Sequence, residues 1–174
     1  MKALVLKRAM SKPMGEIIIR HALREDCAEL VDLMRALAEF EGYIEHFHVT
    51  PSALSEKLFD QQQVSALVAV ADKGLVGMLI YYPLPFTYDL KPWFYIKELF
   101  VKPAFRSQKI GLQLMRVLSE ECDKLGGTKI RWDVLSSNEN AQRFYQSLGA
   151  KHEIDWQLYS LSETAIARLS HSKS

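Results

Sequence analysis

The residues with the clearest chemical meaning lie in a short basic turn between an apolar segment and a long amphipathic one. Arg106 lies on this turn, and Gly111 lies where the following helix is expected to begin. The first N–H groups of a helix have no partner within it, and the helix dipole favours negative charge there. The pattern therefore predicts a site for a phosphorylated small molecule. The alternative is an ordinary strand-to-helix turn whose basic residues are solvated.

The composition is that of an ordinary globular protein. With 174 residues, 48% of them hydrophobic and 25% charged, the chain can form a single domain with a proper core. The net charge of +1 gives no reason to expect nucleic acid or an anionic membrane as a partner. No apolar run approaches the roughly 20 residues that span a bilayer. We expect a cytoplasmic protein.

The residues that often bind metals or form disulfides do not form a recognisable site. Cys27 and Cys122 fall on the apolar faces of expected helices, so we expect buried, reduced thiols. His46 and His48 are spaced for one face of a strand, but no cysteine or carboxylate pattern completes a metal site. We expect loop histidines and no metal.

Hydrophobic periodicity predicts the order β-α-α-β-β-β-α-β-α-β, which favours an α/β fold. Strands are expected over 16–21, 64–71, 75–82, 93–101, 129–135 and 156–161. Helices are expected over 25–41, 51–59, 109–125 and 139–148. We expect a loosely held N-terminal extension over 1–15, one domain over 16–165 and a frayed tail over 166–174.

Capping residues set several of these boundaries. Thr50 followed by Pro51 predicts one helix start, and Asn138 predicts another. Gly42 and Gly149 predict helix ends. A loop is expected between the third and fourth strands, where prolines fall at 83, 85 and 92.

Two separated motifs resemble the GNAT acetyl-CoA-dependent N-acetyltransferases. The first is Arg106-x-x-Lys109-x-Gly111 after an apolar strand, and the second is the segment 138–150, which contains Phe144-Tyr145. The resemblance covers roughly residues 16 to 161. It implies a mixed, mostly antiparallel sheet of six to seven strands with helices on both faces. Within the family, the segments 37–41 and 140–150 are most similar to the diamine (spermidine/spermine) and thialysine acetyltransferase branch.

The resemblance implies acetyl-CoA as co-substrate and no metal. Backbone N–H groups of the turn would hold the pyrophosphate, and the strand before it would carry the thioester and an oxyanion hole. The cofactor-binding residues it implies are Leu99, Phe100, Val101, Arg106, Ser107, Gln108, Lys109, Ile110, Gly111, Leu112 and Asn138.

Lys109 departs from the family pattern, because the family's phosphate loop usually has its first glycine there. A left-handed backbone would make a lysine cost roughly 1–2 kcal/mol at this position. We expect a right-handed backbone instead, since Lys109 lies at the expected helix start. In that case the lysine adds a cation beside the pyrophosphate. The departure bears on the affinity for coenzyme A.

Glu98 is the candidate catalytic base. An alkylamine with a pKa of about 10.4 is neutral less than about one part in a thousand at pH 7, so its proton must be removed. The related diamine enzymes carry two adjacent carboxylates in this strand; here Lys97 replaces the first, and Glu98 keeps the second. Adjacent strand residues point to opposite faces, so the two are expected to do different jobs. The alternative for Glu98 is a surface acid paired with a lysine.

The resemblance also implies the remaining site residues. Tyr145 would be the general acid beside the coenzyme A sulfur; the alternative is a core tyrosine with its hydroxyl at the rim. Phe40 and Glu41 fall where the diamine branch contacts its substrate, although Glu41 could equally be a solvated helix-end acid. Lys97, if it faces the pocket, argues against a doubly cationic polyamine and suits an acceptor with a carboxylate.

The sequence therefore predicts an acetyltransferase acting on a primary amine of a small molecule, by direct attack in a ternary complex. The acceptor would be a polyamine, a diamine or an amino acid with a side-chain amine. Two alternatives are a non-catalytic acyl-CoA-binding regulatory module and a protein N-terminal or lysine acetyltransferase. The resemblance also implies a homodimer paired through the late strands, with neither nucleic acid nor membrane as a partner.

Overall fold

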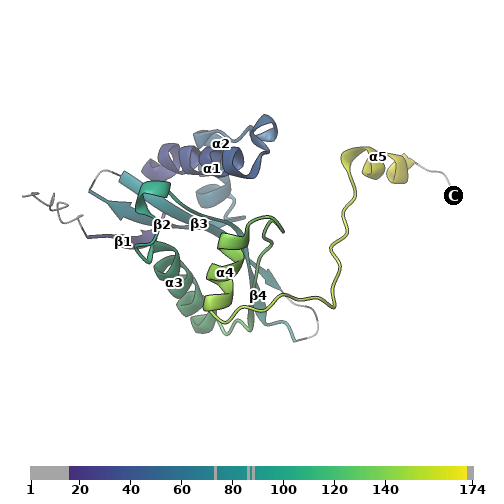
Figure 1. The fold of residues 1–174 in the computed structure, drawn as a ribbon. Helices are drawn as coiled ribbons and strands as arrows, with labels where there is room; N and C mark the ends of the chain where they lie inside the picture. Colours follow the sequence, from purple (N-terminus) through teal and green to yellow (C-terminus); the bar gives the residue numbers. More distant parts are fainter. Residues whose placement is uncertain (1–15, 73, 86, 88, 172–174) are drawn as a thin grey trace, which may run out of the picture. The chain divides into compact units, whose positions relative to one another are not determined.

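The computed structural model describes residues 16–72, 74–85, 87 and 89–171 (Figure 1). The expected N-terminal extension, residues 1–15, lies outside the described residues. The chain forms two compact units, of which the first ends at Asp133 and the second begins at Val134. In the described part, the first unit holds the sheet with its covering helices, and the second holds two helices.

The sheet of the described residues has five strands in the order of the sequence. They are β1 (Ile18–His21), β2 (Ser65–Ala71), β3 (Gly74–Pro85), β4 (Pro92–Val101) and β5 (Lys129–Arg131). Neighbours pair antiparallel except β4 and β5, which pair parallel. The expected mixed, mostly antiparallel α/β sheet is confirmed, with five strands in place of six to seven.

Two expected boundaries are wrong. Residues 156–161 form no strand; they are irregular and lead into α5 (Glu163–His171), so residues 166–171 of the expected frayed tail are helical. An apolar run becomes a strand only beside a pairing partner, and the second unit offers none among its described residues. The expected proline loop is also shorter, because Pro83 and Pro85 pair with β4. Pairing with β2 ends at Tyr81, so these prolines occupy an edge, where proline is tolerated.

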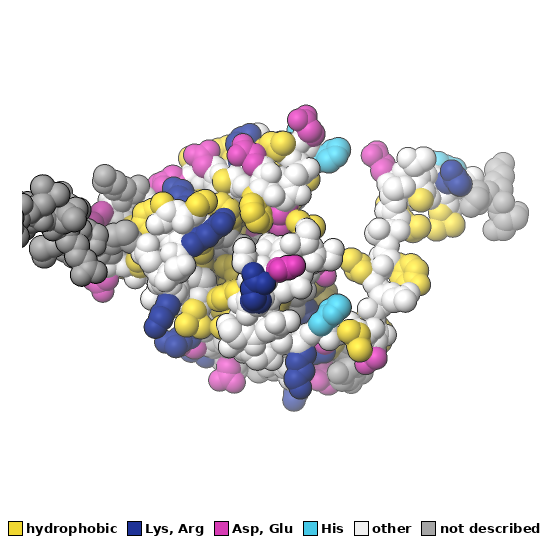
Figure 2. All heavy atoms as spheres, in the orientation of Figure 1, with side chains coloured by type: hydrophobic (Ala, Val, Ile, Leu, Met, Phe, Trp, Pro, Cys, Tyr) yellow, Lys and Arg dark blue, Asp and Glu magenta, His cyan; other side chains and the backbone are white. Residues whose placement is uncertain are grey.

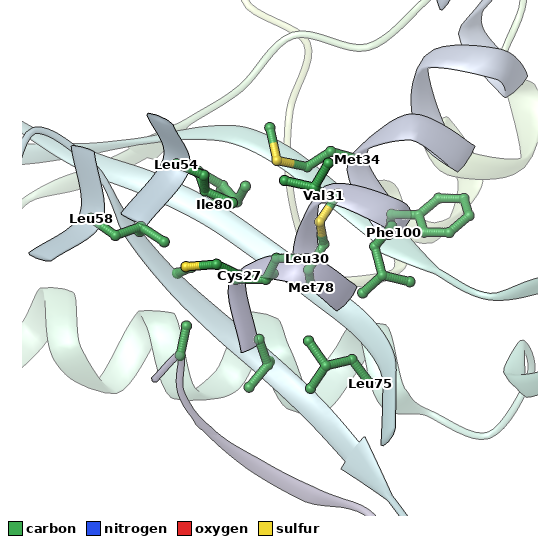
Figure 3. Close-up of a cluster of buried hydrophobic side chains, with 14 of the residues drawn as sticks. Cys27, Leu30, Val31, Met34, Leu54, Leu58, Leu75, Met78, Ile80 and Phe100 are labelled. Atoms are coloured by element: carbon green, nitrogen blue, oxygen red, sulfur yellow. The ribbon is translucent and has the colours of Figure 1, made fainter. Parts of the chain in front are cut away.

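Helices cover both faces of the sheet, as expected. Figure 1 shows α1 (Cys27–Glu41) and α2 (Pro51–Ser55) on one face and α3 (Ile110–Lys124) on the other. The main apolar cluster lies between α1, α2 and the sheet (Figure 3), and its members include Cys27, Leu30, Val31, Met34, Leu54, Leu58, Leu75, Met78, Ile80 and Phe100. Both cysteines are buried free thiols, which confirms that prediction.

Side chains of β3 alternate between the two layers. Met78 and Ile80 belong to the cluster under α1. The Tyr81 hydroxyl donates a hydrogen bond to Glu121 on α3, so Tyr81 lies on the opposite face. This alternation identifies the face of each residue that pairs with β3, including those of the site.

Both ends of α1 are fixed by local contacts. The Asp26 carboxylate accepts hydrogen bonds from Arg20, at 2.6 and 3.0 Å, and from the Leu23 N–H, at 2.7 Å. The Arg20 guanidinium holds the pKa of Asp26 below its usual value. Gly42 adopts φ +80° and ends the helix, and the Tyr43 N–H then donates to the Ala38 carbonyl at 3.0 Å. The chain therefore leaves α1 at a defined point beside β4.

The expected caps are confirmed. The Thr50 hydroxyl accepts a hydrogen bond from the Ala53 N–H at 3.2 Å at the start of α2. In the second unit, the Asn138 carboxamide oxygen accepts from the Ala141 N–H at 3.1 Å and starts α4 (Glu139–Ser147). Gly149 follows α4 with φ +86°.

The surface carries charges of both signs. Acidic and basic side chains are interspersed on the face shown in Figure 2, in keeping with the net charge of +1. Within the described part of the chain, no helix combines the length and the apolar character needed to cross a membrane.

Candidate functional site

β4 is paired unequally along its two edges. It pairs with β3 from Pro92 to Val101, but with β5 only from Trp93 to Tyr95. Beyond Tyr95, the edge that faces β5 has no paired strand among the described residues. A strand edge of this kind can bind an extended ligand through its N–H and C=O groups. The predicted cofactor residues 99–101 lie on this segment.

A β-bulge lies in the middle of β4. Ile80 pairs with Glu98 and Tyr81 pairs with Ile96, so Lys97 is the extra residue. A bulge places two residues opposite one and breaks the regular alternation of side chains. The expectation that Lys97 and Glu98 simply alternate between faces is therefore wrong. Glu98 lies opposite Ile80, on the α1 face.

The Glu98 carboxylate is largely buried. Its Oε2 atom is shielded from solvent and has no hydrogen-bond partner among the described residues. Burial raises the pKa of Glu98 to about 7, with Glu41 raising it further and Lys97 lowering it. Such a carboxylate can exchange a proton near neutral pH, which is the property required of a general base.

Glu98 interacts electrostatically with Glu41, and two further groups, Lys97 and Tyr43, interact with both acids. Burial raises the pKa of Glu41, and the charge of Lys97 lowers it. Burial, together with the charges of Glu98 and Glu41, raises the pKa of Tyr43 to about 12. The structure thus brings the predicted residues Glu41, Lys97 and Glu98 together. Tyr43 was missed by the sequence reading, and its only signal was its place directly after the helix-ending Gly42.

Arg106 connects the end of α1 with the end of β4. Its Nε donates a hydrogen bond to the Val101 carbonyl at 3.1 Å. Its guanidinium carbon lies 5.6 Å from the centre of the Phe40 ring and 5.9 Å from that of Phe100. Phe40, predicted for the acceptor, therefore lies beside Arg106, predicted for the cofactor.

The turn after β4 has two left-handed residues. Ser107 and Lys109 both have φ +63°, and Lys109 is the N-cap of α3. The expected right-handed backbone at Lys109 is wrong. The next residue, Ile110, is only 1% exposed and packs against Gly77. Gly77 leaves no room for a side chain, because an added Cβ would lie 3.1 Å from the Phe100 carbonyl oxygen. The close approach of β3, β4 and α3 requires a sharp turn before the helix.

The start of α3 has the features of an anion site. The hydrogen bond from the Gln113 N–H to the Lys109 carbonyl, at 2.9 Å, is the first of the helix. The N–H groups of the residues before Gln113 have no acceptor within the helix. That turn contains no acidic residue, and Arg106 and Lys109 are exposed cations next to it. A phosphate can be held there by N–H groups, the helix dipole and these cations.

The remaining predicted residues lie elsewhere. His46 ends the short 3-10 helix Ile44–His46, and His48 follows in a loop. No group of three or more histidines, cysteines and acids with the arrangement of a metal site occurs among the described residues. Asn138 and Tyr145 belong to the second unit, where the ring of Tyr145 lies 5.3 Å from that of Phe144. Their roles toward the cofactor stay predictions.

Comparisons with known proteins agree with this geometry. Residues 25–150 match the model of a family described as "Acetyltransferase (GNAT) family". The chain is 28% identical over 151 residues to thialysine N-epsilon-acetyltransferase of Bos taurus, covering 79% of this chain and 86% of that protein. It is 28% identical over 95 residues to L-ornithine N5-acetyltransferase of Arabidopsis thaliana, covering 55% of this chain and 42% of that protein. An integron cassette protein of V. cholerae has a similar fold, with a TM-score of 0.76, 24% identity and coverage of 90% of this chain and 98% of that one.

Replacing Lys109 with glycine tests the strain of the turn. Release of a left-handed lysine is worth roughly 1–2 kcal/mol, and the greater freedom of glycine in the unfolded chain offsets about half of it. We expect the free energy of unfolding of Lys109→Gly to rise by about 0.5–1 kcal/mol in urea denaturation. Lys102→Gly is the matched control, because Lys102 has φ −49°, and it should lower that free energy. Equal destabilisation by both variants would contradict the strain.

Glu98→Gln tests the burial of the carboxylate without an activity assay. The pKa of Glu98 is raised from 4.5 to about 7, so the folded state holds the proton more tightly and stability is lost as pH rises through that range. The loss amounts to at most roughly 3 kcal/mol. We compare the free energy of unfolding of Glu98→Gln with that of the native chain at each pH. We expect this difference, variant minus native, to be about 1–3 kcal/mol larger at pH 8 than at pH 4. Glu45→Gln, which removes an exposed carboxylate, is the matched control; a flat difference for Glu98→Gln would refute its burial.

Proposed function

The chain belongs to the acetyltransferase (GNAT) family and is an acyltransferase, and we propose that it moves an acetyl group from acetyl-CoA to the side-chain amine of a small amino acid. The observation that carries the proposal is Glu98, a buried carboxylate with a pKa near neutrality beside the unpaired edge of β4. The family supplies the reaction, and the side chains around Glu98 support the acceptor class.

Acetyl-CoA would occupy the start of α3 and the open edge of β4. Its pyrophosphate would be held by N–H groups of residues 107–112, with Arg106 and Lys109 as cations. Its pantetheine arm would run along 99–101, and a backbone N–H of that segment would stabilise the oxyanion. The same edge would thus place the thioester carbonyl next to Glu98.

Proton transfer would begin with Glu98. The acceptor arrives as an ammonium, and the carboxylate takes one proton directly or through water. The neutral amine nitrogen then attacks the thioester carbon, forming the C–N bond, and collapse of the tetrahedral intermediate breaks the C–S bond. Tyr145 is proposed to give its proton to the departing thiolate and to recover one, through water, from the positively charged nitrogen of the intermediate, while Glu98 releases its proton to solvent. Coenzyme A and the acetamide leave, and no covalent enzyme intermediate forms.

Glu41 and Lys97 support an amino-acid acceptor. The charge of Glu41 attracts an ammonium. The charge of Lys97 attracts a carboxylate and repels a second cation, unless an acidic group beside that cation offsets the repulsion. The relatives named for thialysine and L-ornithine act on amino acids that carry a side-chain amine. The homodimer and the cytoplasmic location stay predictions from the resemblance.

The pH dependence of the rate tests Glu98. Because the ionised carboxylate is the base, kcat/KM should rise with pH through a midpoint near 7, and Glu98→Gln should lower it by about 10²–10⁴-fold. Removing the positive charge in Lys97→Met should move the midpoint upward, since Lys97 lowers the pKa of Glu98. Steady-state rates from pH 5.5 to 9 with a fixed amine measure both.

Lys91→Met is the control for this profile, because Lys91 is exposed and lies just before β4. It should leave the midpoint unchanged. An unchanged midpoint in Lys97→Met, with an active enzyme, would show that Glu98 is not the titrating base.

Tyr145→Phe tests the proposed acid. A thiol pKa near 8.5 makes the thiolate a tolerable leaving group, so the loss should be modest, about tenfold in kcat. The KM for acetyl-CoA should change little because the ring is retained. Stopped assays of coenzyme A release measure both constants, and Tyr159→Phe serves as an exposed control. An unchanged kcat would remove Tyr145 from the mechanism.

A further inference from the structure

A pair of stacked tyrosines lies on the same face as Glu98. Tyr82 and Tyr95 are cross-strand partners whose ring centres lie 5.4 Å apart at an interplanar angle of 27°. Tyr82 is two residues beyond Ile80 on β3, so both point to the α1 face, where Ile80 faces Glu98. One strand repeat, about 7 Å, therefore separates the tyrosine pair from the Ile80–Glu98 pair.

The bulge at Lys97 creates this arrangement. Tyr95 and Glu98 are three residues apart, and in a regular strand they would point to opposite faces. The extra residue between them restores them to one face. The bulge thus aligns the base and the aromatic pair along a single line.

The tyrosine pair ends at a carboxylate. The Tyr95 hydroxyl donates a hydrogen bond to Asp133, an exposed residue two positions after β5. Burial and the charge of Asp133 raise the pKa of Tyr95 to about 12, so the hydroxyl remains a donor at physiological pH. Arg131, the other charged group that acts on Tyr95, lies 5.3 Å from the centre of the Trp93 ring.

The chemistry of this cluster fits a second ammonium group. Both tyrosines are partly exposed, and neither belongs to the apolar cluster under α1. Electron-rich ring faces attract an ammonium, and a carboxylate fixed by a hydrogen bond adds a directed acceptor. The exposed Lys97 lies between this cluster and Glu98 along β4 and can take a carboxylate.

We propose that Tyr82, Tyr95 and Asp133 form a subsite for the α-ammonium group of a diamino acid acceptor. This inference rests on the proposed function and adds the second recognition element. The side-chain amine would lie at Glu98, the α-ammonium at Asp133 and the rings, and the α-carboxylate at Lys97. The separation of about 7 Å between the tyrosine pair and the Ile80–Glu98 pair suits the extended side chain of lysine and its analogues.

Four acceptors that differ only in their distal groups test the subsite. L-Lysine has both distal charges, 6-aminohexanoate lacks the ammonium, 1,5-diaminopentane lacks the carboxylate, and pentylamine lacks both. With the native enzyme, kcat/KM should be about fivefold or more higher for lysine than for 6-aminohexanoate, as for a partly exposed ion pair. In Asp133→Asn this ratio should fall toward one, because only the tyrosine rings would still attract the ammonium, and pentylamine, which lacks both distal groups, is the reference acceptor.

Two control variants separate the contributions. Asp123→Asn, an exposed acid on α3, should keep the native ratio. Lys97→Met should instead reduce the preference for lysine over 1,5-diaminopentane and leave the ammonium effect intact when compared at the pH of maximal activity. Thermal unfolding of each variant confirms that it is folded.

The outcomes distinguish the two levels of the proposal. The subsite alone would be overturned if the enzyme acetylates these amines but the ratio of kcat/KM for lysine to that for 6-aminohexanoate is the same in the native enzyme and in Asp133→Asn. Failure of the native enzyme to acetylate any of the four acceptors would overturn the proposed function together with the subsite. A loss of activity with all four acceptors in folded Asp133→Asn would also overturn the subsite, because it would show a role common to every acceptor.

Discussion

The partial pairing of β4 is the constraint from which the site follows. A parallel neighbour normally continues along the whole strand, but β5 ends its pairing at Tyr95 while β3 continues to Val101. The unpaired edge would be a liability in a surface strand, because backbone N–H and C=O groups need partners. On β4 it is the edge that the proposed function assigns to the extended cofactor arm. The same point of divergence places Tyr95 and Asp133 at the end of the paired segment.

Glu98 shows how the fold and the chemistry oppose each other. Its cross-strand neighbour Ile80 belongs to the apolar cluster, so the carboxylate is held against the core rather than in water. A surface position would give Glu98 an ordinary pKa and no driving force to accept a proton near pH 7. The buried carboxylate therefore lowers stability above neutral pH, and in the proposed function this loss accompanies a base that can accept a proton near pH 7. Lys97 limits the effect, because its charge lowers the same pKa.

The sequence predicted the elements that depend on local signals. The caps at Thr50 and Asn138 and the glycine stops are decided within one turn of helix, and all were found. Residues 156–161 were predicted as a strand because their composition favours one, but a strand needs a partner that composition cannot supply. The bulge at Lys97 was also missed, because a register shift depends on the facing strand. The sequence therefore could not predict which side chains the bulge aligns with Glu98. Glu98 as the base was inferred from the resemblance and stays a prediction.

Lys109 is the clearest case in which structure changes the meaning of a departure from the family motif. Its left-handed backbone costs roughly 1–2 kcal/mol relative to glycine. The strain belongs to the turn of the folded chain, so it enters the folding equilibrium. The cation beside the start of α3, in contrast, acts only when an anion is present, and an exposed pair of this kind contributes at most about 1 kcal/mol. The two effects are of similar size but enter different equilibria. Lysine at this position therefore lowers the stability of the fold, whereas in the proposed function its charge would strengthen the binding of a phosphate.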